Sequence, residues 1–154
     1  MDNIALKQVN YEGITMQVPQ KWEVNTEAYD EEDGTKSYTM SINAKGRDAR
    51  SVNISWGTVP EGYDAYNGAC ATYDDVVGEE DLSVNDEPIL CFEFQGKKAY
   101  GFSAWADGDM PCFFFCQDIP SEDKKKLLTV LMCAANNEDL ESLMDFVEEN
   151  LAVE

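Results

Sequence analysis

The fold of this chain is decided by two neighbouring stretches, Ser37-Tyr38-Thr39-Met40-Ser41-Ile42-Asn43-Ala44 and Val52-Asn53-Ile54-Ser55-Trp56-Gly57. In both stretches, apolar residues alternate with Ser, Thr and Asn. A period of two with one polar face is typical of antiparallel strands that are covered on one side. The intervening Lys45-Gly46-Arg47-Asp48 has the composition of a turn, so the two stretches predict a β-hairpin.

The same alternation extends the predicted sheet towards both ends of the chain. Upstream, Ile14, Met16 and Val18 alternate with polar residues as far as Pro19, and Asp33-Gly34 supplies a turn before the hairpin. Downstream of Pro88, we predict three further strands joined by compact turns, as in a meander. These strands are 89–94, 99–105 and 112–117, with turns at 95–97 and 107–109. Because Cys112-Phe113-Phe114-Phe115-Cys116 is apolar on both faces, it should lie centrally, covered above and below.

Apolar residues at three- and four-residue spacing predict helices in three other places. One follows Pro60 and runs from Tyr66 to Val77, although Gly68 within it disfavours a helix. The second spans 121–135, where Ser121 begins it and leucines form a stripe; a strand from Leu127 to Ala134 is the alternative. A third spans 137–151 and is capped by Asn137. We therefore predict an α+β fold, with a mostly antiparallel sheet of about six strands flanked by helices in one domain, 1–154.

The chain is strongly acidic and contains no histidine. It has 31 Asp and Glu against 11 Lys and Arg, a net charge of -20. Binding to nucleic acids and anionic membranes requires clusters of basic residues, so neither is an expected partner. The negative charge favours a basic protein surface as the partner instead. Without imidazole, Ser-His-Asp and Cys-His catalysis and His-ligated zinc are excluded. We predict no enzymatic activity and no cofactor.

Cysteine usage and the absence of targeting signals predict a cytoplasmic protein. The N-terminal residues lack a signal peptide, and no apolar run approaches the roughly 20 residues of a membrane span. The 5 cysteines are scattered and odd in number, which is typical of reduced thiols. Cys112 and Cys116 would lie about 13 Å apart on one strand, too far for a disulfide.

Two acidic turns raise the question of calcium binding. They are Asp30-Glu31-Glu32-Asp33-Gly34 and Asp107-Gly108-Asp109. Neither matches an EF-hand loop, which ends in a Glu at position twelve; counted from Asp30, that position is Ser41. We therefore predict solvated turns and no metal site, while divalent-cation binding at these turns is left open.

The segment Tyr11-Glu12-Gly13-Ile14-Thr15-Met16-Gln17-Val18-Pro19-Gln20-Lys21-Trp22 resembles the opening of the Mog1/PsbP-like superfamily. Its members begin with an aromatic-Gly-strand-Pro-x-x-Trp segment, and the order of elements that follows here is similar. The resemblance covers residues 10–135 and leaves 136–154 as an additional C-terminal helix. It implies an antiparallel sheet between helices and a binding or accessory role without catalysis.

These features favour a non-catalytic interaction protein that binds a partner protein. The candidate partner-binding residues are the polar strand face and an acidic segment: Thr39, Ser41, Asn43, Asn53, Ser55, Asp74, Asp75, Glu79, Glu80 and Asp81. One alternative is a small-ligand-binding protein or a carboxylate-based hydrolase with a pocket between sheet and helices. Another is an immunity-type or chaperone-like inhibitor of a basic partner. The oligomeric state and the partner's identity are left open.

Overall fold

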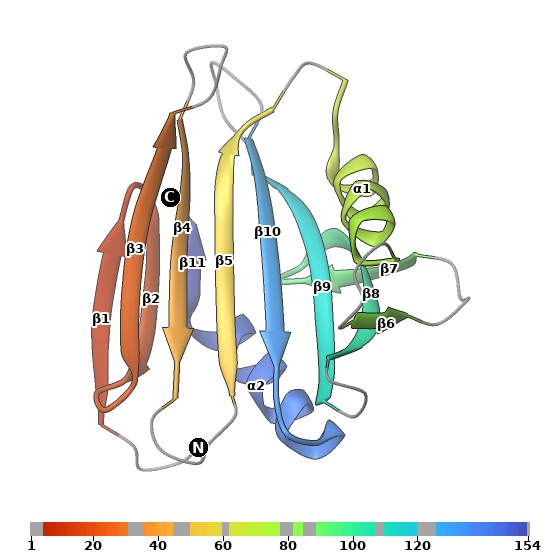
Figure 1. The fold of residues 1–154 in the computed structure, drawn as a ribbon. Coiled ribbons are helices and arrows are strands. Elements are labelled where there is room, and N and C mark those ends of the chain that lie inside the picture. The colour runs from red at the N-terminus through yellow and green to blue at the C-terminus, as the bar shows by residue number, and fades with distance from the viewer. Residues whose placement is uncertain are drawn as a thin grey trace.

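The computed structural model describes residues 5–30, 36–44, 50–59, 62–77, 82–84, 89–106, 110–119 and 126–153. In these ranges the chain forms an eight-stranded and a three-stranded sheet with two helices (Figure 1). The elements are β1 Leu6–Tyr11, β2 Ile14–Pro19, β3 Glu23–Asp30, β4 Lys36–Asn43, β5 Ser51–Thr58, α1 Ala65–Val77, β6 Leu82–Val84, β7 Leu90–Phe94, β8 Lys97–Ala106, β9 Met110–Ile119, β10 Lys126–Cys133, α2 Asn137–Asn150 and β11 Leu151–Val153.

The large sheet has the order β3-β4-β5-β10-β9-β8-β6, with β7 also paired to β8, and the small sheet has the order β1-β2-β11. All pairings are antiparallel within the described residues. The predicted hairpin is confirmed, since β4 pairs with β5 and Thr39 lies opposite Ser55. The predicted meander is confirmed as β7-β8-β9. The turn residues 33–34, 45–48 and 107–109 lie outside the described ranges.

The prediction of a helix over 121–135 is wrong, because residues 126–133 form β10, a strand between β5 and β9. Its side chains are buried on both faces: Leu128, Val130 and Met132 on one, Leu127 on the other. A strand that is covered on both faces of the sheet has no polar face, so its sequence shows no alternation of apolar and polar residues. Leu, Met and Lys favour helices, but this preference is weak beside the burial that a central strand gains.

The sheets contain more strands than the sequence predicts, because several strands are short or exposed. β3 is an edge strand in which every side chain except Val24 is exposed, so it carries no apolar alternation. Polar and charged side chains are common on edge strands, where they oppose pairing with another chain. β1 buries its alternate residues only partly, and β6 and β11 have three residues each.

Both remaining helices were predicted at nearly the right bounds. α1 contains Gly68 because the helix packs closely on the sheet: a Cβ there would lie 2.7 Å from Leu127 Cδ2 and 3.2 Å from Cys116 Sγ. α2 begins at Asn137, as predicted, and ends at Asn150, one residue earlier than predicted. Its N-cap is Asn136, not Asn137: Asn136 Oδ1 accepts a hydrogen bond from the Asp139 backbone N–H at 2.8 Å.

Different elements cover the two faces of the large sheet. One face packs on the small sheet and α2 through the main core, which includes Met16, Met40, Ile54, Val130 and Leu143. On the opposite face, α1 covers β8, β9 and β10. Figure 1 shows α1 at one side of the sheet, so no described helix or strand covers β3, β4 and β5 on this face. This uncovered area positions the candidate site.

Candidate functional site

The five strand residues predicted as candidate contacts lie together on one face, which we call the open sheet face. Antiparallel registers place residues side by side in rows that cross β3, β4 and β5. One row is Glu27, Thr39 and Ser55; the next is Asn25, Ser41 and Asn53; the third is Glu23, Asn43 and Ser51. Thr39, Ser41 and Ser55 are half-buried, whereas Asn43 and Asn53 are exposed.

Hydrogen bonds connect the polar side chains of the open sheet face. Asn53 Nδ2 donates to Ser41 Oγ at 3.2 Å, and Ser55 Oγ donates to Asn53 Oδ1 at 3.5 Å. Hydroxyl and amide groups both donate and accept, so each retains capacity for another partner. The result is a neutral polar surface that can bond to the backbone or side chains of a second molecule.

The acidic residues of the open sheet face come from β3, the strand that the sequence did not predict. Glu23 and Glu27 are exposed and lie opposite Asn43 and Thr39. Tyr29, which is 46% exposed, donates a hydrogen bond from its hydroxyl to the Glu27 carboxylate. This hydrogen bond raises the pKa of Tyr29 above its ordinary value. The concentration of acid in 23–33 was visible in the sequence, but nothing indicated that it borders the hairpin.

A shallow hollow lies beside these rows, next to α1. Its volume is about 230 Å³. It is lined by Ser37, Tyr38, Thr39, Ser55, Trp56, Gly57, Thr58, Val59, Leu127 and Thr129. Its floor is close-packed, because a Cβ at Gly57 would come within 2.9 Å of Ser37 Cβ. The described residues that line it are rich in hydroxyl groups and include no carboxylate, so they do not provide the acid pair of a glycoside hydrolase.

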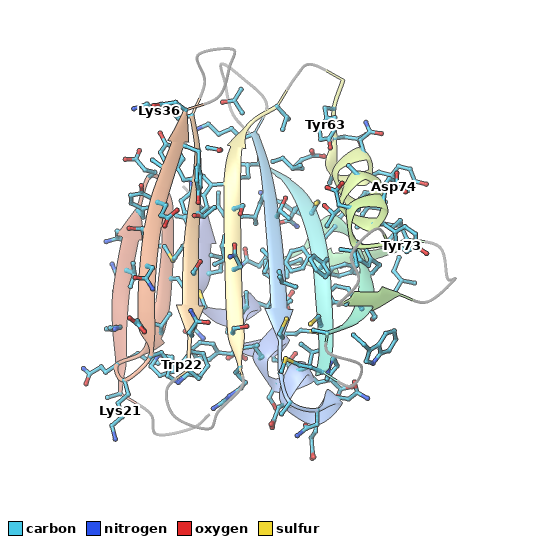
Figure 2. The ribbon with its side chains drawn as sticks, in the orientation of Figure 1. Lys21, Trp22, Lys36, Tyr63, Tyr73 and Asp74 are labelled. Atoms are coloured by element: carbon cyan, nitrogen blue, oxygen red, sulfur yellow. The ribbon has the colours of Figure 1, made fainter. Side chains whose placement is uncertain are left out.

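The described part of the second candidate surface, the acidic segment, lies on α1. Asp74 and Asp75 are exposed residues of α1. Figure 2 shows Asp74 on the side of α1 that is turned away from β5. Glu79, Glu80 and Asp81 lie outside the described residues. The structure therefore unites the five strand residues and separates Asp74 from them.

No group of three Cys, Asp or Glu side chains that could hold a metal ion occurs among the described residues. The acidic turn at 31–34 and Asp107-Gly108-Asp109 lie outside those ranges; Asp30, at the end of β3, is described and exposed. In the part of the chain that the structure describes, neither helix is both long and apolar enough to cross a membrane.

The layers described above define a Mog1/PsbP-like α+β fold. The chain is similar in structure to cyanobacterial PsbP (CyanoP) from Synechocystis sp. PCC 6803, whose solution structure superposes with a TM-score of 0.55. The match covers 97% of this chain and 92% of that chain at 17% sequence identity, so it establishes the fold. No protein-family model matches the chain, and no curated protein matches its sequence.

Proposed function

We propose that the chain is a non-catalytic binding protein, working in the cytoplasm, that docks a basic segment of a partner protein on the open sheet face. The observation behind this proposal is that rows of neutral polar side chains lie next to Glu23 and Glu27 on a side of the sheet that no described helix or strand covers at β3, β4 and β5. None of the residues in these three rows is Lys or Arg.

Side-chain alternation supports an acidic surface here despite nearby lysines. Lys36 has the same strand parity as Tyr38 and Met40, which face the small sheet. Lys126 likewise has the parity of Leu128, on the covered side. The charged side chains that β3, β4 and β5 direct to the open sheet face, within the described residues, are therefore negative. Together with a net charge of -20, they attract a basic segment and should accelerate its association in a salt-dependent way.

The size of the hollow favours a side chain over a small molecule as its occupant. Pockets for small ligands typically measure about 300–1,000 Å³. The hollow, at about 230 Å³, is smaller and shallow. It can receive one side chain of a docked segment, while Tyr29 supplies an exposed aromatic ring at the edge. An inhibitor of a basic effector is a special case of this function.

A pair of matched variants tests the proposal. Ser55→Arg adds bulk and positive charge to the open sheet face, and Ser142→Arg adds the same group to an exposed position of α2. Binding of a fluorescent Lys-rich peptide is measured by anisotropy at low and physiological salt. We expect Ser55→Arg to weaken binding about tenfold, equivalent to about 1.4 kcal/mol, and Ser142→Arg to change it less than about twofold. Equal affinities of the two variants would mean that attraction is diffuse, and would refute the open sheet face as the site.

A further inference from the structure

We propose that Cys112 and Cys133 form a reversible disulfide that links β9 to β10 beneath α1. The pair borders the open sheet face, because Cys133 lies opposite Ser51 of the third row. The inference does not rest on the function proposed for that face. Cys133 lies directly opposite Cys112 in the antiparallel register of the two strands. Their Sγ atoms are 2.7 Å apart. This contact is closer than ordinary packing and lies just beyond an S–S bond length of about 2.05 Å.

The backbone already has the separation that a disulfide requires. Directly opposed residues of antiparallel strands have Cα atoms about 4.5–5.5 Å apart. Disulfides span Cα separations of about 4.4–6.8 Å, so no strand movement is needed to form the bond. Both β9 and β10 are central strands held by neighbours on either side, which keeps the two sulfurs in place.

The two thiols differ in access, which assigns them different roles. Cys112 is 1% exposed and packs in the cluster of Val76, Phe102 and Phe114 under α1. Cys133 is half-buried at the border of the same cluster. An oxidant therefore reaches Cys133 first, and Cys112 is the resolving thiol. The hydrogen bond with Cys112, followed by burial, raises the pKa of Cys133, so its thiolate is scarce at neutral pH and the pair oxidises slowly there.

The other three cysteines have different neighbours. Cys91 lies opposite Tyr100 on β8, and Cys116 lies opposite Thr129 on β10, with its Sγ 3.5 Å from the Thr129 hydroxyl. Cys70 lies on α1 and is half-buried. In the strand pairings of the described residues, one cysteine lies opposite another in a single case, Cys112 and Cys133.

The chemistry balances with a small-molecule disulfide, RSSR, as oxidant. The Cys133 thiolate attacks one sulfur of RSSR, a mixed disulfide forms, and RS⁻ leaves and takes up the proton that Cys133 released. Cys112 then loses its proton and attacks Cys133 Sγ, the mixed disulfide breaks, and a second RS⁻ leaves and is protonated. Two protein thiols are oxidised and RSSR is reduced to two RSH. A small dithiol reverses both steps.

The test uses the full chain in its reduced form and oxidised glutathione as the probe. After incubation at pH 8, free thiols are capped with N-ethylmaleimide and the intact mass and peptide map are recorded. We expect a species with three capped thiols, a peptide cross-link between Cys112 and Cys133, full reversal by dithiothreitol, and a melting temperature several degrees above that of the reduced chain. Cys133→Ser should abolish the cross-link, and Cys91→Ser should leave it unchanged.

Each other outcome overturns the proposal. Five capped thiols after oxidation would show that the pair does not close. A cross-link between other cysteines, or a glutathione adduct on Cys133 that Cys112 never displaces, would do the same. Because the wild-type peptide map decides between these results, the test does not depend on the folding of any variant.

Discussion

The indole Nε1 of Trp56 donates a hydrogen bond to the backbone carbonyl of Glu12 at 3.1 Å, which joins the large sheet to the turn between β1 and β2. Tyr11 and Tyr38 pack around the same indole, with ring centroids 6.0 Å from it in each case. Trp56 belongs to the β4–β5 hairpin, whose other side forms part of the open sheet face, so this contact fixes the hairpin on the small sheet beneath it.

Trp56→Phe should lower the free energy of unfolding by about 1–3 kcal/mol. The substitution leaves the Glu12 carbonyl without its indole donor and removes part of a ring that is 4% exposed. Chemical denaturation measures the effect. A change below about 0.3 kcal/mol would contradict the importance of this link between the sheets.

Glu12 and Gln95 form a matched pair, because both have the left-handed backbone conformation, with φ of 47° and 54°. Glu12→Gly should raise the free energy of unfolding by about 0.5 kcal/mol, since relief of about 1–2 kcal/mol of backbone strain exceeds the entropy that glycine adds to the unfolded chain. Gln95→Gly should lower it by about 1.5 kcal/mol, because the substitution also removes the bonds from Nε2 to the Glu148 and Leu151 carbonyls at 2.9 and 2.6 Å. The measurement is chemical denaturation. Changes of the same sign in the free energy of unfolding of the two variants would contradict this prediction.

Gly101→Ala should disrupt the pairing of β8 with β9. A Cβ at Gly101 would lie 2.2 Å from the Phe114 carbonyl oxygen and 2.8 Å from Phe115 Cβ, and neither atom can move without the strand. We expect a loss of at least about 3 kcal/mol in the free energy of unfolding. Gly96→Ala is the control: φ is +78° but nothing lies within 4 Å, so only backbone strain of about 1–2 kcal/mol applies. Equal losses from the two variants would contradict the close packing at Gly101.

The hydroxyl of Tyr29 should titrate above the ordinary range of tyrosine, because the Glu27 carboxylate accepts its hydrogen bond. Since the pKa is raised in the folded chain, the bond contributes its stability below the unfolded pKa and loses it as pH rises through the folded pKa. Ultraviolet difference titration against a Tyr29→Phe reference measures the midpoint. We expect Glu27→Gln to lower that midpoint. An unchanged midpoint would show that the two side chains do not interact in solution.

Much of the sheet could be predicted because a strand that is buried on one face has alternating apolar and polar residues. The hairpin of β4 and β5 has this pattern, and so five of its polar residues were correctly placed on one face: Thr39, Ser41, Asn43, Asn53 and Ser55. β9 was correctly predicted as central because it is apolar on both faces. A strand with one buried and one solvent-exposed face, as in this hairpin, can therefore be recognised from the sequence.

The rest could not be predicted because the pattern is absent or ambiguous. β10 is covered on both faces, so its leucines are compatible with a helix as well as with a strand. Because residues 121–135 were predicted as a helix, the strand pairing that places Cys133 opposite Cys112 was not predicted. β3 is exposed, so nothing indicated that Glu23 and Glu27 border the polar rows. The position of Asp74 depends on how α1 packs, which local sequence does not encode.

The most direct test of binding on the open sheet face is an NMR titration of side-chain amides with the Lys-rich peptide. The Asn53 amide bonds to Ser41 and Ser55 on this face, whereas the Asn150 amide donates to the Phe146 carbonyl within α2 at 2.8 Å and is the internal reference. If a basic segment docks on this face, the Asn25 and Asn53 amides should show saturable shifts that diminish with salt, and the Asn150 amide should not move. Shifts at Asn150, or at the Asn67 amide of α1, with Asn53 unmoved would contradict it.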